Sequence, residues 1–516
     1  MTFDANDLVL SLPILFLSVA GVVLLLLDAF SRTVLVGRQH QLSMPSETSE
    51  ALAVPPPGSR DFLMPVTVFF LLATLGILVW QATTLPENAV TIYRGMLVVD
   101  RFGLFMSGVC VLATLLGVFS APSYLRAHRM EFGEYYALLA FSLVGMLILI
   151  QAADLVTLFL GLETMSLGAY VLTGSWRRSP RSAEAAMKYF LVGAFVSGLL
   201  IYGIALLYGV TEATAFADIK RAAMTRGTAP LFYIGWMLVL VAFAFKLGVV
   251  PYHMWAPDTY EGAPTPVTGF MMSCIKAAGF AGLIRLLHGV LPMLARVPFT
   301  GWTYVLSWLS VLTMTLGNLA ALKQDNVKRM LAYSSISHAG YLLVGLVALG
   351  TVGERARGPL LFYLASYALT VVAALGVVAW VGCDERGEER TRLADLAGLG
   401  KREPMAALLL TISLLSLGGF PPTAGFFGKF YLFQAALYDD KLLWLVLWAV
   451  GNSLVSVYYY LRVITAMYFR EAPAQPTTVP LQSAVMRVGV LVTTLLVLGL
   501  GLFPGWLSAL AAQAKF

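Results

Sequence analysis

Five ionisable side chains lie inside stretches of sequence that are otherwise strongly apolar: Glu163, Lys188, Lys246, Lys276 and Lys429. Charged groups are costly in the hydrocarbon of a bilayer, so those retained there usually serve a function. Burial lowers the pKa of a lysine and raises that of a carboxylic acid, which lets such groups exchange protons near neutral pH. Lys246, Lys276 and Lys429 are expected near mid-depth beside a single acid, so pairing within the chain cannot neutralise all three. The pattern predicts buried proton sites.

Glu163 and Lys188 stand on consecutive predicted helices, where they could form an ion pair. Such a pair would bias the proton affinity of the next lysine, Lys246. The alternative for Lys188 is a place near the end of its helix, from which a long side chain reaches the membrane surface.

Two histidines, His253 and His338, could close the gaps between the buried lysines. Imidazole titrates near neutral pH and can pass protons along a chain of waters. For each histidine, a buried ring with satisfied hydrogen bonds is the alternative. The complete predicted proton relay consists of Glu163, Lys188, Lys246, Lys276, Lys429, His253 and His338.

The composition shows what kind of molecule must position these groups. The chain has 516 residues, of which 59% are hydrophobic and 12% charged, whereas soluble domains carry about 25% charged residues. This excludes a soluble globular protein, a disordered chain and a nucleic-acid binder. The 3 cysteines lie far apart in sequence, so we expect neither a disulfide framework nor an iron–sulfur or zinc site.

The apolar stretches predict an all-α polytopic membrane protein, because a bilayer core needs about 20 apolar residues per helix. Fourteen spans are expected, near residues 8–30, 62–83, 102–121, 135–152, 155–174, 184–209, 230–250, 265–290, 300–322, 327–350, 358–382, 404–440, 442–469 and 484–508. The stretch 404–440 contains the helix-breaking run Gly418–Pro422, and the stretch from 230 continues past a similar break at Pro251. Both are predicted to be discontinuous helices.

The distribution of Lys and Arg predicts the orientation of the chain. Loops after odd-numbered spans, with their flanking turns, hold 18 of these residues, while the opposite side holds 10 and the spans hold 6. Positive charge gathers on the cytoplasmic side, so both termini should lie on the periplasmic side.

An internal repeat relates the two halves of the chain. The segment Glu163–Gly174 aligns with Ser334–Gly345 at an offset of 171, and Leu247–Pro251 aligns with Leu417–Pro421 at an offset of 170. Five spans fall within this offset, an odd number, so the second copy must be inverted in the membrane. Inverted repeats that each contain a broken helix are typical of transporters. The alternative is chance similarity between apolar helices.

Three motifs resemble those of a known family. The run Pro251-Tyr-His-Met-Trp-Ala-Pro-Asp-Thr-Tyr-Glu-Gly-Ala-Pro264 is similar to a signature of subunit N of proton-pumping NADH:quinone oxidoreductase, respiratory complex I. The runs Gly161-Leu-Glu-Thr-Met-Ser-Leu167 and Gly425-Phe-Phe-Gly-Lys-Phe430 fit the same family. The resemblance covers spans 2 to 14 in order.

The resemblance implies an antiporter-like subunit in the membrane arm that translocates protons, driven by quinone reduction in other subunits. It assigns Glu163, Lys188, Lys246, Lys276, Lys429 and His253 to the family's relay positions. No cofactor is expected in this chain, whereas NADH, FMN, iron–sulfur clusters and quinone are expected on other subunits of the complex. The implied location is the bacterial inner membrane.

The expected organisation is helices 1–3 in residues 1–133, a first five-helix repeat in 134–298, an inverted repeat in 299–472 and helix 14 in 473–516. Helices 1–3 and helix 14 are expected at the periphery. Two other functions remain open from the residues alone. The chain could be a free-standing cation/proton antiporter, or a scaffold that moves no protons. Several costly buried charges make a poor scaffold, which disfavours the latter.

Overall fold

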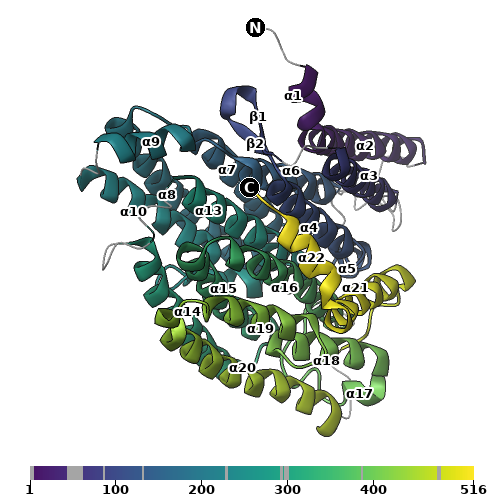
Figure 1. Ribbon diagram of the computed structural model, residues 1–516. Helices are drawn as coiled ribbons and strands as arrows, with labels where there is room; N and C mark the ends of the chain where they lie inside the picture. The colour runs from purple at the N-terminus through teal and green to yellow at the C-terminus, as the bar shows by residue number, and fades with distance from the viewer. Residues whose placement is uncertain are drawn as a thin grey trace.

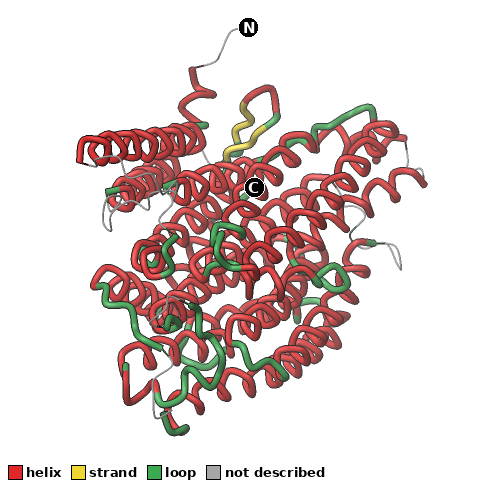
Figure 2. The backbone as a smooth tube through the Cα atoms, turned by 180° about the vertical axis from the view of Figure 1, so that it is seen from behind, coloured by secondary structure: helices red, strands yellow, loops and turns green. Residues whose placement is uncertain are grey.

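A computed structural model of the chain describes residues 5–42, 62–84, 88–130, 133–226, 230–290, 295, 301–384, 388–472 and 478–516. Most of the 31–61 segment, whose role the sequence left open, lies outside these residues. In the described part, 13 helices are long and apolar enough to cross a membrane, and the shorter apolar helix Pro404–Gly418 accounts for the fourteenth expected crossing. The predicted all-α polytopic fold is confirmed (Figure 2).

The N-terminal part contains the three long helices that were predicted. It also contains a small β hairpin that the sequence did not predict. Its elements are α1 (Ala5–Leu10), α2 (Leu12–Leu42), α3 (Leu63–Thr84), β1 (Val90–Ile92), β2 (Leu97–Val99), α4 (Arg101–Val118) and α5 (Ala121–Ala127). Strands β1 and β2 pair in antiparallel fashion. Helices α2 and α3 lie together at one edge of the molecule, as expected (Figure 1). The expectation that helix 3 is peripheral is wrong, because α4 packs among α6, α13 and α16 and is largely buried.

The first repeat runs from α6 to α13. Its elements are α6 (Glu134–Gln151), α7 (Leu155–Thr173), α8 (Pro180–Thr211), α9 (Phe216–Arg226), α10 (Pro230–Leu247), α11 (Trp255–Gly262), α12 (Thr265–Phe270), a π-helical turn (Met271–Ile275) and α13 (Lys276–Val290). Helices α10 and α11 are the two halves of the predicted broken helix. The helix α12, the π turn and α13 form one continuous span, residues 265–290.

The second repeat and the C-terminal helices follow. Their elements are α14 (Trp302–Leu322), α15 (Val327–Val352), α16 (Glu354–Val381), α17 (Leu399–Arg402), α18 (Pro404–Gly418), α19 (Ala424–Ala436), α20 (Leu443–Phe469), α21 (Ala484–Leu502) and α22 (Pro504–Gln513). Helices α18 and α19 are the halves of the second predicted broken helix. Helix α16 lies at the centre, in contact with α4, α15, α18, α19 and α21.

Matching local features show the relation between the two repeats. Asp154 caps the N-terminus of α7 through its side chain, and Asn326 caps α15 in the same way, 172 residues later. Helix α6 packs on α7, and α14 packs on α15. Close approach in both pairs depends on glycine, because a Cβ added at Gly145 or Gly340 would meet the backbone of the facing helix. Each repeat thus begins with the same tightly packed helix pair.

Candidate functional site

Lys246 lies in the last turn of α10, directly before the break in that helix. The helix ends because Gly248 adopts a positive φ of 69° and because Pro251 has no N–H to continue the hydrogen-bonding pattern. The Lys246 side chain is buried, and its Nζ donates hydrogen bonds to Ser166 Oγ at 2.6 Å and to Tyr189 OH at 3.1 Å. Hydroxyl groups therefore hold this cation.

Two aromatic rings complete the surroundings of Lys246. Its Nζ lies 5.4 Å from the ring centroid of Tyr170 and 5.2 Å from that of Tyr189. The negative faces of such rings stabilise a cation without carrying a formal charge.

Glu163 lies on α7, one turn before Ser166, and its carboxylate accepts a hydrogen bond from Ser197 on α8. Ser197 and Lys246 both line a small cavity enclosed by α7, α8 and α10. Most of the other side chains that line this cavity are apolar, among them Leu162, Val196 and Phe245. The structure thus brings Glu163 and Lys246 to one site.

Lys188 does not pair with Glu163. Its Nζ contacts Glu184 Oε1 at 2.7 Å and Asp258 Oδ2 at 2.8 Å, and its side chain is 44% exposed. The reason is the height of the residues along α8: Ser197, the partner of Glu163, lies nine residues beyond Lys188, which is about 14 Å of helix. The predicted Glu163–Lys188 pair is therefore absent from the ion pairs in the described residues.

Lys276 follows the π turn, and its buried Nζ donates to the carbonyl of Ser335 at 2.6 Å and to the Ser335 hydroxyl. The hydroxyl of Tyr367 on α16 donates to Ser335 Oγ at 2.8 Å, and the Tyr367 ring centroid lies 5.9 Å from Nζ. Turns of π-helix interrupt a helix most often at functional positions. Like Lys246, Lys276 is held by hydroxyl, carbonyl and aromatic groups.

His338 lies one turn after Ser335 on α15, is buried, and contacts several tyrosines. Its Nδ1 is 2.7 Å from Tyr363 OH, and its Nε2 is 3.3 Å from Tyr460 OH. Its ring lies 4.8 Å from the ring of Tyr367, beside the Lys276 site. The prediction that His338 lies between buried lysines agrees with this placement, because it also contacts Tyr341, which faces Lys429.

Lys429 lies on α19, and its side chain reaches across the break to the end of α18. Its Nζ donates to the carbonyl of Gly418 at 3.1 Å and to Ser453 Oγ at 2.9 Å, and it lies 4.9 Å from the ring centroid of Tyr341. Gly418 is the last residue of α18, where the unpaired carbonyls and the helix dipole favour a cation. The Lys429 ammonium therefore lies beside the C-terminal end of α18, whereas Lys246 is itself part of the last turn of α10.

His253 lies in the turn between α10 and α11 and stands apart from the lysines. It is half-buried, and its Nδ1 has no hydrogen-bond partner within the described residues. No hydrogen bond in that part of the chain joins it to Lys246 or Lys276. The prediction that His253 bridges the buried lysines is thus not supported by a hydrogen bond in the described residues.

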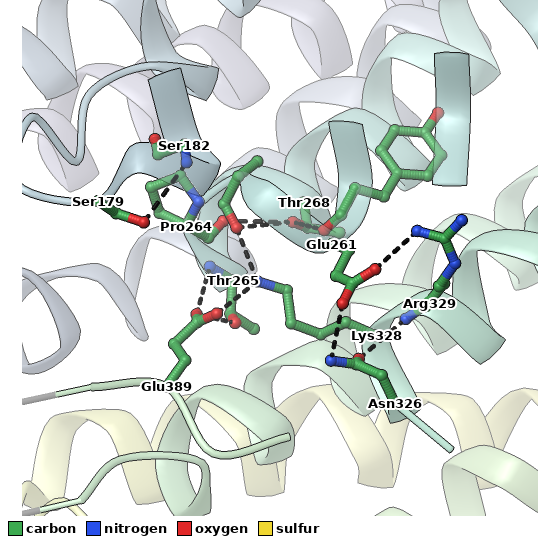
Figure 3. A network of polar contacts seen from close by, with 12 residues as sticks. Ser179, Ser182, Glu261, Pro264, Thr265, Thr268, Asn326, Lys328, Arg329 and Glu389 are labelled. Carbon is green, nitrogen blue, oxygen red and sulfur yellow. Dashed lines mark hydrogen bonds and ion pairs between the residues drawn. The ribbon is translucent and has the colours of Figure 1, made fainter. Parts of the chain in front are cut away.

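Sequence reasoning missed a polar network at the N-terminal ends of α12 and α15 (Figure 3). Lys328 is fully buried and pairs with Glu389 at 2.7 Å. Arg329 joins Asp258 and Glu261, both at 2.8 Å, so Asp258 bridges Arg329 and Lys188. Lys328 lies at a predicted helix end and Glu389 in a predicted loop, where the sequence suggests exposed side chains, and only tertiary packing brings the two together in the interior.

Glu389 lies in the loop between α16 and α17, outside the membrane spans. Burial alone would raise the pKa of this carboxyl, but the Lys328 ammonium and hydrogen bonds from Thr265 and Tyr124 outweigh burial and hold the pKa below its ordinary value. Burial, together with the charge of Glu389, raises the pKa of the Tyr124 phenol well above its ordinary range. Glu389 is thus held as a carboxylate.

Arg285, in α13, is a second buried cation outside the predicted relay. Its position near a span end suggests a side chain that reaches the membrane surface, but it is buried. Its guanidinium binds Asp100 in bidentate fashion, with both N–O distances 2.8 Å, and its Nε donates to Ile150 O at 2.6 Å. A planar guanidinium suits this paired geometry, which explains a buried charge without a transport role.

Two of the cysteines also meet, although they lie far apart in sequence. Cys110 on α4 and Cys274 in the π turn are buried and free, and the thiol of each lies within 3.7 Å of the other's backbone carbonyl. Among the described residues, no group of three or more His, Cys, Asp or Glu side chains is arranged to hold a metal ion.

Comparison with known proteins shows what the chain is similar to. A transmembrane family described as NADH:quinone oxidoreductase/Mrp antiporter matches residues 152–456. NADH-quinone oxidoreductase subunit N 1 of Sorangium cellulosum is 45% identical, over 97% of this chain and 97% of that protein. A chain of respiratory complex I from Thermus thermophilus with bound aureothin has a TM-score of 0.76 at 31% identity and covers 97% of this chain and 99% of its own length.

A more distant structure shares the fold alone. A chain of an Mrp complex from a Dietzia species has a TM-score of 0.80 at 23% identity, over 98% of this chain and 96% of that one.

Proposed function

Because the chain belongs to the subunit N family of NADH-quinone oxidoreductase, we propose that it is a membrane-arm subunit that moves protons through its buried Glu, Lys and His side chains. One contrast supports this most strongly. The buried cations Lys328 and Arg285 each bind a carboxylate. Lys246, Lys276 and Lys429 are equally buried, yet no ion pair in the described residues includes them. Cations without counter-charges are costly for stability alone, which favours a role in which they gain and lose protons.

The contacts of these lysines suit proton exchange. Each ammonium donates to a hydroxyl, of Ser166, Ser335 or Ser453. A hydroxyl both accepts and donates hydrogen bonds, so it can pass a proton while remaining neutral. In the second repeat, the groups between Lys276 and Lys429 are hydroxyls and the His338 ring. Water is required wherever consecutive groups lie beyond hydrogen-bond distance.

Glu163 is proposed to control the first site of the relay. Its carboxylate is bound by Ser197, which lines one small cavity together with Lys246, so a change in its charge or orientation would alter the proton affinity of Lys246. Lys188, on the exposed side of α8, would receive the signal from a neighbouring subunit and transmit it through Asp258. If the complex with Glu163→Gln retained full turnover and full pumping, this control step would be wrong.

The driving reaction is proposed to take place elsewhere in the complex. Quinone reduction in other subunits would supply the energy, and NADH, FMN, the iron–sulfur clusters and quinone would bind there, with no cofactor in this chain. Its partners would be other membrane-arm subunits and the lipid bilayer.

The orientation and the domain boundaries are also proposals. The excess of Lys and Arg in the loops after odd-numbered spans supports a bacterial inner-membrane protein with both termini on the periplasmic side. The Lys328–Glu389 network would then face the cytoplasm. Residues 134–298 and 299–472 would form the two inverted units, with 1–133 and 473–516 outside them. Cysteine labelling from one side of sealed vesicles would test the orientation at either terminus.

Purification in a mild detergent tests assembly directly. We expect an affinity-tagged chain to migrate with NADH dehydrogenase activity in a large assembly. A free-standing antiporter would instead migrate alone and would exchange Na⁺ or K⁺ for protons in liposomes without NADH. Migration alone together with such exchange would contradict the proposed function and support the alternative.

A further inference from the structure

The span that carries Lys276 is held at both ends by buried ion pairs. This span, residues 265–290, comprises α12, the π turn and α13, and its most apolar window is entirely buried. Glu389 and Lys328 lie at its N-terminal end, whereas Asp100 and Arg285 lie near its C-terminal end. In the described part of the chain, these are the two ion pairs in which both side chains are at most 13% exposed.

At the N-terminal end, Glu389 caps the helix from a loop. Its Oε1 accepts hydrogen bonds from the backbone N–H of Thr265 at 3.2 Å and from the Thr265 hydroxyl at 2.5 Å. Its Oε2 accepts from Lys328 Nζ at 2.7 Å, and Lys328 also donates to the carbonyl of Ala263 at 2.7 Å (Figure 3). Since Lys328 is the second residue of α15 and Thr265 is the first of α12, the pair joins the beginnings of these two helices.

The same two helices meet again at Lys276. Ser335, which accepts from Lys276, lies on α15 seven residues after Lys328, or about 10 Å along the helix. The Glu389–Lys328 pair therefore fixes the register with which Lys276 faces its acceptor.

Near the C-terminal end of the span 265–290, Asp100 holds the helix as Glu389 does at its beginning. Its carboxylate binds Arg285, nine residues after Lys276, and also accepts from the backbone N–H of Gly103 at the start of α4. Arg285 is thereby tied to α4 and, through the carbonyl of Ile150, to the end of α6. The span cannot slide or rotate without breaking a buried ion pair.

We propose that Glu389, Lys328, Asp100 and Arg285 are positioning residues for the Lys276 site: the two ion pairs clamp its helix so that Lys276 stays aligned with Ser335. The proposal rests on the proposed function, in which Lys276 is a proton site. It assigns a task to four charged residues outside the relay, and it explains why these buried charges have counter-charges whereas Lys276 has none among the described residues.

The native thiol of Cys274 provides a reporter of helix position. It lies two residues before Lys276 and is buried against the carbonyl of Cys110 at 3.6 Å. A helix that is released at one end will expose this thiol more often, so its reaction rate with N-ethylmaleimide will rise. The rate is measured on the intact complex in membrane vesicles, by mass spectrometry of the peptide that contains Cys274.

With Glu389→Gln we expect labelling of Cys274 to be about tenfold faster, equivalent to ~1.4 kcal/mol of lost helix positioning. Glu389→Asp, which keeps the charge, should restore a rate near that of the unmodified complex. Glu388→Gln is the matched control, because Glu388 is exposed and pairs with Arg390 instead. An unchanged rate with Glu389→Gln would overturn the proposal.

A second variant tests the proposal if the complex with Glu389→Gln does not assemble. Glu389→Gln combined with Lys328→Met removes both charges and leaves no unpaired ion in the interior. The same faster labelling is expected, and a rate like that of the unmodified complex would overturn the proposal.

Proton pumping then separates this proposal from the proposed function. If Lys276→Ala lowers the number of protons pumped per electron and Glu389→Gln lowers it too, both stand. If Lys276→Ala lowers the ratio but Glu389→Gln does not, the clamp is unnecessary for alignment and the proposal fails. If Lys276→Ala leaves the ratio unchanged, the role of Lys276 in the proposed function fails, whatever the labelling rates show.

Discussion

At the scale of residues, the buried cations of this chain fall into two classes that burial alone does not distinguish. Lys328 and Arg285 bind carboxylates, whereas Lys246, Lys276 and Lys429 bind hydroxyls, carbonyls and aromatic faces. The first arrangement fixes a charge in place, and the second suits the proton exchange that we propose. The two kinds of buried cation are thus distinguished by whether a carboxylate binds them.

The Lys328–Glu389 pair predicts a loss of stability in acid. The pKa of Glu389 is held below its ordinary value, so its ionised form contributes stability that is complete above the ordinary carboxyl pKa of about 4.3. This contribution is lost as pH falls through the lowered pKa of the folded state. We expect the complex with Glu389→Gln to lack that component, which thermal unfolding of the purified complex between pH 7 and pH 3 will measure. Identical acid dependence in both complexes would contradict the assignment.

The candidate proton sites Lys246, Lys276 and Lys429 could be selected from the sequence because a lysine inside an apolar stretch stands out. The sequence did not show their partners. The Glu163–Lys188 pair was predicted from neighbouring helices, but the height along α8 decides contact, and Lys188 meets Asp258 instead. Lys328 and Glu389 were not predicted to be buried, because charged residues at helix ends and in loops usually lie at the surface.

At the scale of elements, each broken helix has a lysine ammonium beside the C-terminal end of its first half: Lys246 ends α10, and Lys429 on α19 reaches the end of α18. Proline and glycine made both breaks predictable from sequence, at Gly248–Pro251 and Gly418–Pro422. The β hairpin and the burial of α4 were not predictable, because short strands and the packing of an apolar helix depend on distant contacts. An apolar sequence does not distinguish a lipid-facing helix from one enclosed by other helices.

The break after Lys246 predicts a specific sensitivity at Gly248. Its φ of 69° is strained for other residues, while an added Cβ would have no neighbour closer than 3.8 Å. Gly248→Ala should therefore cost about 1–2 kcal/mol through backbone strain and without a clash. Gly248→Asn should cost less, because asparagine tolerates this conformation. The melting temperature of the purified complex measures both, and equal losses for Ala and Asn would argue against this explanation.

At the scale of the whole molecule, the two inverted repeats bring their polar groups to a common interior. Helix α15 carries Ser335 and His338 from the second repeat, and Ser335 accepts from Lys276 of the first. The polar series therefore crosses from one repeat to the other at this contact. The repeat itself was visible in sequence as matched motifs, but the contact between the copies was not, because it joins residues 59 positions apart.

The most direct test of the central claim is the number of protons pumped per electron by the reconstituted complex carrying Lys246→Ala. The control is Lys441→Ala, which removes an exposed lysine that follows α19. If Lys246 is a proton site, its replacement lowers this ratio, and the control leaves it unchanged. A complex with Lys246→Ala that assembles, oxidises NADH and pumps with the unmodified ratio would contradict the account.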